Sequence, residues 1–196
     1  DVVFRKGEPG ASSYDAVVSG VKSLIDRYDF IDKDRIALNG HSWGGYQIAF
    51  LVTRTNMFKA AVSGAPVVNM TSAYGGIRWE SGKSRMFQYE QTQSRIGGTL
   101  WDKPAEFIRN SPLFFLPQVQ TPVLIMHNDK DGSVMWEQGI EFFMALRRLD
   151  KPVWLFNYKG EGHHLKKWEN RLDYSRRVME FYDYYLKDGK KPEWMK

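Results

Sequence analysis

The sequence of 196 residues contains no cysteine. This absence excludes a disulfide framework, a zinc site built from thiolates and a cysteine nucleophile. Long hydrophobic runs are also missing, because no stretch approaches the roughly 18 apolar residues that a membrane helix needs. We therefore expect a soluble protein with no membrane partner. Its compartment is left open, because a cysteine-free domain folds equally well in the cytoplasm, in the periplasm or outside the cell.

A large excess of one charge is absent as well, since the net charge is only +5. Much of the basic excess lies between residues 166 and 191, where acidic residues interrupt it. No signature of a nucleic-acid-binding module accompanies it, so we interpret it as a solvated face and expect no nucleic-acid partner. No signal peptide is found at the start. The chain begins with Asp1, which we interpret as the start of a processed or excised piece, with any targeting segment upstream.

Bulky apolar residues are abundant, with 7 Trp, 10 Tyr and 12 Phe, and the length suits one domain with a real core. Short apolar runs alternate with amphipathic segments, which is typical of a parallel α/β sheet. Strands are expected at residues 35–40, 59–66, 122–128 and 152–158. Helices are expected near residues 12–28 and 44–56, between the last two strands, and after the fourth strand. The apolar face expected for the third of these helices consists of Trp136, Ile140, Phe143 and Met144. Residues 67–116 have no clear period and predict short helices and functional loops.

The most specific motif is Gly40-His41-Ser42-Trp43-Gly44-Gly45, at the junction of a strand and a helix. A serine in this place must lie on a very tight turn, and we expect Gly40 and Gly44 to be needed because side chains there would clash. The turn exposes the Ser42 hydroxyl and directs the start of the helix toward it. Ser42 is therefore a candidate nucleophile, and the backbone N–H of Trp43 is a candidate oxyanion donor.

A serine nucleophile needs a base and an acid that orients the base, each on a loop after a later strand. Two adjacent histidines, His163 and His164, follow the fourth strand, and two aspartates, Asp129 and Asp131, follow the third. These residues by themselves leave both pairs open. We interpret His127, at the end of the third strand, as a structural histidine.

The same residues fit a metal site poorly. A calcium loop aligned on Gly132 would have His127 and Gln138 at its first and last positions, and neither is an adequate ligand there. Adjacent side chains such as His163 and His164 rarely converge on one ion, which argues against zinc. We expect neither a metal nor another cofactor.

Three stretches, GHSWGGY, LIMHNDKDGSV and YKGEGHHL, resemble the catalytic domain of the prolyl oligopeptidase family of serine peptidases, which includes dipeptidyl and acylaminoacyl peptidases. The resemblance covers nearly the whole chain. It implies Ser42 as the nucleophile, Asp131 as the acid and His163 as the base, with a peptide substrate cleaved through an acyl-enzyme. The family usually has Gly where this chain has Asn128, and we expect Asn to tolerate a positive φ there.

The resemblance further implies that residues 1–196 are a partial α/β-hydrolase catalytic domain, the C-terminal half of that fold, with a mainly parallel sheet flanked by helices. The N-terminal strands, the second oxyanion donor and the β-propeller of the family would then be absent from this chain. The strand at residues 35–40 would become a sheet edge. Either this edge pairs with a second copy of the chain, which gives a homo-oligomer, or residues 1–10 cover it. We expect the chain alone to be a weak or inactive hydrolase.

For the substrate pocket, the irregular region offers four candidates, with a plain core role as the alternative: Trp79, Met86, Phe87 and Tyr89. Two other functions stay open. One is a carboxylesterase of the same fold, which acts on small acyl esters with an identical triad. The other is a non-catalytic binding module with a vestigial triad. Relative rates on aminoacyl amides and on plain esters separate the peptidase from the esterase.

Overall fold

The computed structural model describes residues 4–196. Its main sheet has four parallel strands in the order β1-β2-β5-β6. These strands are β1 (Ala37–His41), β2 (Ala60–Gly64), β5 (Val123–Met126) and β6 (Val153–Phe156). The four predicted strands are confirmed, with their ends within about two residues of the prediction. Because all four strands run the same way, their carboxyl ends meet at one edge of the sheet.

Helices connect and cover these strands, and a two-stranded hairpin lies apart from the sheet. The helices are α1 (Pro9–Arg27), α2 (Trp43–Val52), α3 (Met70–Tyr74), α4 (Met86–Glu90), α5 (Pro104–Arg109), α6 (Trp136–Arg148) and α7 (Trp168–Leu186), with 3₁₀ turns η1 (Pro112–Gln118) and η2 (Glu193–Met195). The hairpin pairs β3 (Ile77–Arg78) with β4 (Lys83–Ser84). Residues 67–116 thus consist of short elements and loops, as expected. Within residues 4–196, no helix combines the length and the apolar character that crossing a bilayer requires.

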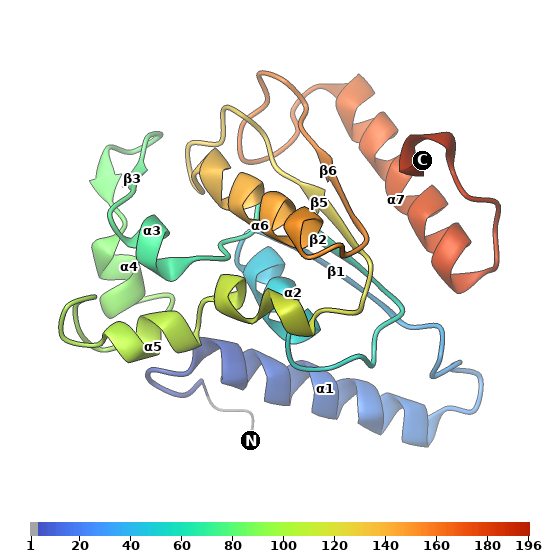
Figure 1. Cartoon of the computed structure of the whole chain (residues 1–196), viewed down its shortest axis with the longest axis horizontal. Helices are drawn as coiled ribbons and strands as arrows, with labels where there is room; N and C mark the ends of the chain where they lie inside the picture. Colours follow the sequence, from blue (N-terminus) through green and yellow to red (C-terminus); the bar gives the residue numbers. More distant parts are fainter. Residues whose placement is uncertain (1–3) are drawn as a thin grey trace.

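Both faces of the main sheet are covered by helices, with α2 and α6 on one side and α7 on the other (Figure 1). Successive strand residues point to opposite faces. In β2, Ala61 belongs to the core beneath α2 and α6, whereas Ala60 and Val62 belong to the core beneath α7. In β5, Ile125 and Leu124 divide in the same way. This two-sided packing explains why β5 and β6 appear in the sequence as continuous apolar runs.

The strand that leads to Ser42 lies at the edge of the sheet. Among the described residues, β1 pairs with β2 alone, and its residues are half-buried or exposed, whereas β2 and β5 are buried throughout. The predicted sheet edge is therefore confirmed. Cover by residues 1–10 is wrong for their described part, because Gly7 donates its N–H to the Arg95 carbonyl at 2.7 Å and α1 already begins at Pro9. Residues 1–3 lie outside the described residues, and self-association through the edge stays a prediction.

The helix α6 turns a different face to the core than its hydrophobic pattern predicts. Ile140 and Met144 of the predicted face are exposed, whereas Gln138 and Phe142 are buried. The amide oxygen of Gln138 accepts the backbone N–H groups of residues 68 and 69, at 3.0 and 2.9 Å. Because buried N–H groups need acceptors, a polar side chain belongs on the inner face here.

Candidate active site

Ser42 lies in the turn between β1 and α2, with a φ of 59° and a ψ of −117°. A positive φ is uncommon for a residue other than glycine and is found where the surrounding structure enforces it. The N–H of Ser42 donates to the carbonyl of Gly64 on the neighbouring strand at 2.8 Å. This bond ties the strained turn to the sheet and holds Ser42 at the carboxyl edge.

Two glycines, Gly40 and Gly45, permit the close packing around Ser42, and only Gly40 is one that the motif led us to expect. A Cβ on Gly40 would lie 2.8 Å from the backbone of Gly44, and a Cβ on Gly45 would lie 2.3 Å from the carbonyl oxygen of Gly64. A Cβ on Gly44 would meet no atom of the described residues within 4 Å. The predicted need for glycine is confirmed at Gly40 and wrong at Gly44. Gly45 has that role instead, because there α2 touches the backbone at the end of β2.

Asp131 is buried in the loop that follows β5. Its Oδ1 accepts the backbone N–H groups of Ser133 and Val134, both at 2.8 Å, while its Oδ2 faces Nδ1 of His163 at 2.8 Å. Nε2 of the buried His127 lies 3.4 Å from the same Oδ2. Burial acts to raise the pKa of Asp131, but hydrogen bonds from His127 and His163 and the charge of His163 outweigh it and hold that pKa well below its usual range. The carboxyl group is therefore ionised.

His163 lies between the other two side chains, in the loop that follows β6. Its Nδ1 faces Asp131, and its Nε2 lies 2.9 Å from Oγ of Ser42. An ionised carboxylate only accepts hydrogen bonds, so Nδ1 carries the proton and Nε2 directs its lone pair at the serine hydroxyl. This geometry suits the removal of the hydroxyl proton while the oxygen attacks an acyl carbon. The structure thus brings together the three residues chosen from the sequence.

Polar side chains join the loop of Asp131 to the loop of His163. Asn128 donates its side-chain N–H to the carbonyl of Gly162 at 2.8 Å and accepts the backbone N–H of Tyr158 at 3.1 Å. Asn128 does not have a positive φ, so the expectation for its backbone is wrong, and the side chain is what this position uses. Asp129, the rejected candidate acid, accepts the N–H of Gly160 at 2.7 Å and so joins the same loops. In the sequence, the one sign of this bridging role was that Asn128 stands where the family usually has glycine.

Glu161 connects the loop of His163 to the start of α7. Its carboxylate accepts the backbone N–H groups of Lys166 and Lys167, at 2.8 and 3.0 Å, and the side-chain N–H of Asn170 at 2.7 Å. The hydrogen bond from Lys166 is the main cause that lowers the pKa of Glu161. Glu161 was visible in the sequence as part of the motif around His163, but only the structure assigns it to the support of this loop.

The hairpin turn between β3 and β4 contacts the loop of Asp131 from the other side. The Ser133 hydroxyl donates to the carboxylate of Glu80 at 3.2 Å and accepts from the guanidinium of Arg78 at 3.1 Å. Trp79, which lies between these two residues in sequence, is 73% exposed. Its side chain is therefore free to contact a substrate, and its role in the pocket stays a prediction.

The other pocket candidates differ in exposure. Phe87 is exposed and Met86 is half-buried, so a role in substrate binding stays a prediction for both. Tyr89 is only 1% exposed and packs against Tyr74 and Phe107 in a hydrophobic core that α2 shares with α3 to α5. A substrate contact is closed to it, so the expectation is wrong for Tyr89, because an aromatic side chain suits a core as well as a pocket.

The backbone N–H of Trp43, the candidate oxyanion donor, lies at the first position of α2. Trp43 is the first residue of α2, so its N–H has no acceptor within the helix. It directly follows Ser42 and lies at the positive end of the helix dipole. The predicted role of this N–H stays a prediction.

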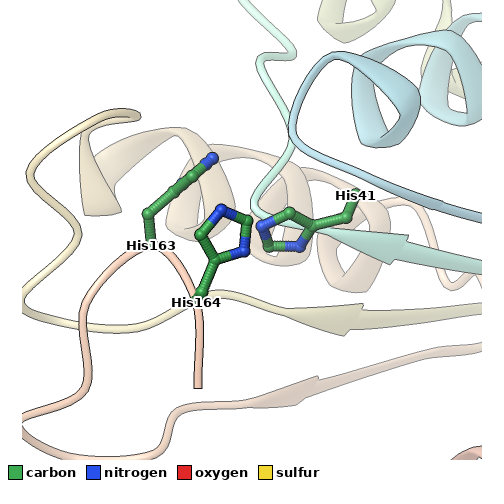
Figure 2. Close-up of side chains that lie close together, drawn as sticks. All are labelled: His41, His163 and His164. Atoms are coloured by element: carbon green, nitrogen blue, oxygen red, sulfur yellow. The ribbon is translucent and has the colours of Figure 1, made fainter. Parts of the chain in front are cut away.

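Two further histidines, His41 and His164, lie close to His163 (Figure 2). The ring of His41, at the end of β1, lies 4.7 Å from the rings of His163 and His164, and those two rings lie 4.8 Å apart, measured between centroids. The rings of the two adjacent histidines therefore lie close together, and the expectation that they do not share an ion stays a prediction. Burial, followed by the charges of His163 and His164, lowers the pKa of His41 to about 4, so its ring is neutral at neutral pH.

Comparison with known proteins identifies the family of this chain. A sequence model described as the prolyl oligopeptidase family matches residues 4–189. The chain belongs to the prolyl oligopeptidase family. This membership confirms the resemblance that the three sequence motifs carry.

Several relatives in the prolyl oligopeptidase family are similar over most of this chain. An uncharacterized peptidase, YuxL, from Bacillus subtilis is 31% identical over 166 residues, which are 83% of this chain and 23% of that protein. The human acylamino-acid-releasing enzyme is 29% identical over 179 residues, 88% of this chain and 23% of that enzyme. The chain thus spans less than a quarter of the length of these relatives.

Among solved structures, an acylaminoacyl peptidase of Pyrococcus horikoshii has a TM-score of 0.82 and 21% identity, over 95% of this chain and 30% of that one. A puromycin-hydrolyzing peptidase of Mycobacterium tuberculosis has a TM-score of 0.79 and 23% identity, over 92% of this chain and 26% of that one. These likenesses establish the fold of the α/β-hydrolase peptidases, a mostly parallel sheet flanked by helices.

Proposed function

We propose that Ser42, Asp131 and His163 form the catalytic triad of a serine peptidase that cleaves oligopeptides through an acyl-enzyme. The observation that supports this most directly is the pair of contacts at His163, 2.9 Å to the Ser42 hydroxyl and 2.8 Å to the Asp131 carboxylate. Membership of the prolyl oligopeptidase family supports a peptide bond as the target.

The chemistry then has two halves. As Oγ of Ser42 attacks the peptide carbonyl, Nε2 of His163 takes the hydroxyl proton, and the charge that forms on the carbonyl oxygen is stabilised by the N–H of Trp43. Asp131 keeps the imidazole in the required tautomer and stabilises its positive charge. His163 then returns the proton to the departing amine, leaving the acyl group on Ser42. In the second half, water attacks the acyl-enzyme by the same proton path, which restores the serine and releases the acid.

The substrate class rests on the relatives. Proteins similar to this chain include acylamino-acid-releasing enzymes and human dipeptidyl peptidase 8. We therefore propose short peptides as substrates. Two sets of p-nitroanilides test this, one set made from N-acylated amino acids and the other from dipeptides with a free amino terminus. p-Nitrophenyl acetate distinguishes the esterase alternative. A peptidase should turn over at least one anilide, whereas activity confined to the ester would favour the esterase.

The triad itself is tested with a fluorophosphonate probe, which reacts with an activated serine whatever the substrate. Ser42→Ala should abolish labelling, and His163→Ala should slow labelling and any turnover by about 10⁴–10⁶-fold. In turnover, the double variant should lose little more than either single variant, because triad members act as one unit. Asp129→Asn is the matched control for Asp131→Asn and should have far less effect. Labelling retained in Ser42→Ala would contradict the assignment, and absence of labelling in the parent chain would favour a non-catalytic module.

We also propose that the 196-residue chain alone turns over slowly. β1, the strand that leads to Ser42, has a free edge within the described residues. Trp43 is the one oxyanion donor that we assign, and the loss of one donor costs about 10²–10³ in rate. Its turnover should lie well below that of the Pyrococcus horikoshii acylaminoacyl peptidase assayed alongside. Equal turnover would contradict the proposal, and sedimentation would show whether the edge of β1 also causes self-association.

A further inference from the structure

Three histidines from two distant parts of the chain meet beside Ser42. His41 ends β1, while His163 and His164 lie in the loop after β6 (Figure 2). One ring nitrogen of each histidine lies within 4.8 Å of one ring nitrogen of the other two. Zinc binds histidine nitrogens at about 2.0–2.1 Å, so tetrahedral ligands lie about 3.3 Å apart. The nitrogens need to approach by about 1.5 Å at most, and the exposed His164 side chain has room to move.

The surroundings of the three rings suit a metal ion. Asp131 accepts a hydrogen bond from Nδ1 of His163 at 2.8 Å, which is the carboxylate–histidine arrangement that orients metal ligands and raises their basicity. His41 has a buried Nε2 that finds no hydrogen-bond partner among the described residues, and an unpaired imidazole nitrogen can serve as a metal ligand. The exposure of His164 gives an ion access from solvent.

We infer that His41, His163 and His164 form a binding site for Zn²⁺ that switches the enzyme off. The ion takes the lone pair of Nε2 in His163, which is the lone pair that otherwise accepts the proton of Ser42. Three imidazoles leave the fourth tetrahedral position to water or to the Ser42 hydroxyl. The binding of zinc stands on the geometry of the three rings. Only its inhibitory effect rests on the proposed function.

Binding is tested on the 196-residue chain without any substrate. Zn²⁺ is titrated by calorimetry, and Co²⁺ serves as a visible stand-in, because the filled d shell of Zn²⁺ has no colour whereas tetrahedral Co²⁺ absorbs. We expect one equivalent to bind and a tetrahedral Co²⁺ spectrum. His164→Ala and His41→Asn should each weaken binding by at least 10–100-fold, the loss that removal of an outer hydrogen-bond partner already causes. Asp34→Asn, an exposed carboxylate elsewhere, is the matched control and should bind as the parent does.

Inhibition is then read from fluorophosphonate labelling. Zn²⁺ should block labelling of the parent chain, and a chelator should restore it. His164→Ala should still be labelled without zinc. It should also be labelled at zinc concentrations that block labelling of the parent chain. Circular dichroism of both histidine variants excludes loss of fold as the cause.

The outcomes separate the two proposals. Equal Zn²⁺ affinity in the parent and in both histidine variants would overturn the site, as would absence of binding at millimolar ion. Histidine-dependent binding without any labelling would keep the metal site and contradict the proposed peptidase. Labelling that Zn²⁺ does not affect, despite histidine-dependent binding, would overturn the inhibitory switch.

Discussion

The turn that carries Ser42 and the loop that carries His163 reach the same site by different means. The turn is held by backbone contacts. The N–H of Ser42 donates to the carbonyl of Gly64, and Gly40 and Gly45 lie too close to other backbone atoms to have room for a Cβ. The loop of His163 is held by side chains, chiefly Asn128 and Glu161.

This difference predicts two kinds of response to mutation. A backbone in contact with backbone cannot yield without moving a strand or a helix, so changes at the turn should damage the fold and the site together. Side-chain hydrogen bonds contribute about 0.5–1.5 kcal/mol each, and several of them hold the loop of His163. Changes there should be graded, and they should displace the imidazole more than they unfold the chain.

The largest effect is expected from Gly45→Ala. The new Cβ would lie 2.3 Å from the Gly64 carbonyl oxygen, so α2 and β2 must separate. We expect a loss of about 3 kcal/mol in the free energy of unfolding, the upper end for overpacking, with loss of fluorophosphonate labelling. Gly44→Ala is the adjacent control. Its Cβ meets open space, so helix propensity predicts no loss, or a gain of up to about 1 kcal/mol. Urea unfolding measures both, and equal stability of the two variants would break the comparison.

A smaller effect is expected from Asn128→Ala. The change leaves the partly buried Gly162 carbonyl and Tyr158 N–H without the partner that the buried Asn128 gives them. We expect about 1–2 kcal/mol less stability. The rate of fluorophosphonate labelling should fall by more than the fraction of unfolded chain accounts for, because the loop of His163 loses its connection to the loop of Asp131. Asn157→Ala, which removes a single bond of 3.3 Å to the Asp129 N–H at the surface, is the control and should change little. If Asn157→Ala reduces labelling as much as Asn128→Ala, the buried bridge is not what positions His163.

The smallest effect is expected from Asp173→Asn, and it should depend on pH. Asp173 accepts hydrogen bonds from Tyr158 in the loop of His163, at 2.8 Å, and from Arg177, at 2.6 Å. The Arg177 bond is the main cause that lowers the pKa of Asp173 below its ordinary value of 3.8. A carboxyl with a lowered pKa stabilises the fold above its ordinary pKa, and this contribution is lost as the pH falls through the pKa of the folded state.

Asp173→Asn should therefore be less stable than the parent at pH 7, by less than about 1 kcal/mol for this partly exposed pair. The difference should shrink as the pH falls below about 3.8. The loss caused by Gly45→Ala is steric and should not vary with pH. Thermal unfolding between pH 3 and 7 measures both variants, and a constant difference for Asp173→Asn would show that its charge does not support the loop.

Much of the fold and of the candidate site could be predicted from the sequence. The strands β5 and β6 were visible because packing on both faces leaves short, continuous apolar runs. Position after a strand left Asp129 beside Asp131 and His164 beside His163, and the resemblance of the motifs to the prolyl oligopeptidase family implied Ser42, Asp131 and His163. The buried face of α6 was mispredicted. Gln138 lies on that face because its amide oxygen accepts the backbone N–H groups of residues 68 and 69. The sequence of the helix alone cannot reveal these distant partners.

By itself, the sequence determined the order of strands and helices, since periodicity and local motifs depend on near neighbours in the chain. Its resemblance to a family then implied Ser42, Asp131 and His163 as the residues of the site. The tertiary structure alone decided that Gly45, rather than Gly44, has no room for a side chain, and that Asn128 joins two loops. It also brought His41 beside His163 and His164. Each of these features depends on distances between segments that are far apart in sequence, which only the packing of the strands and helices sets.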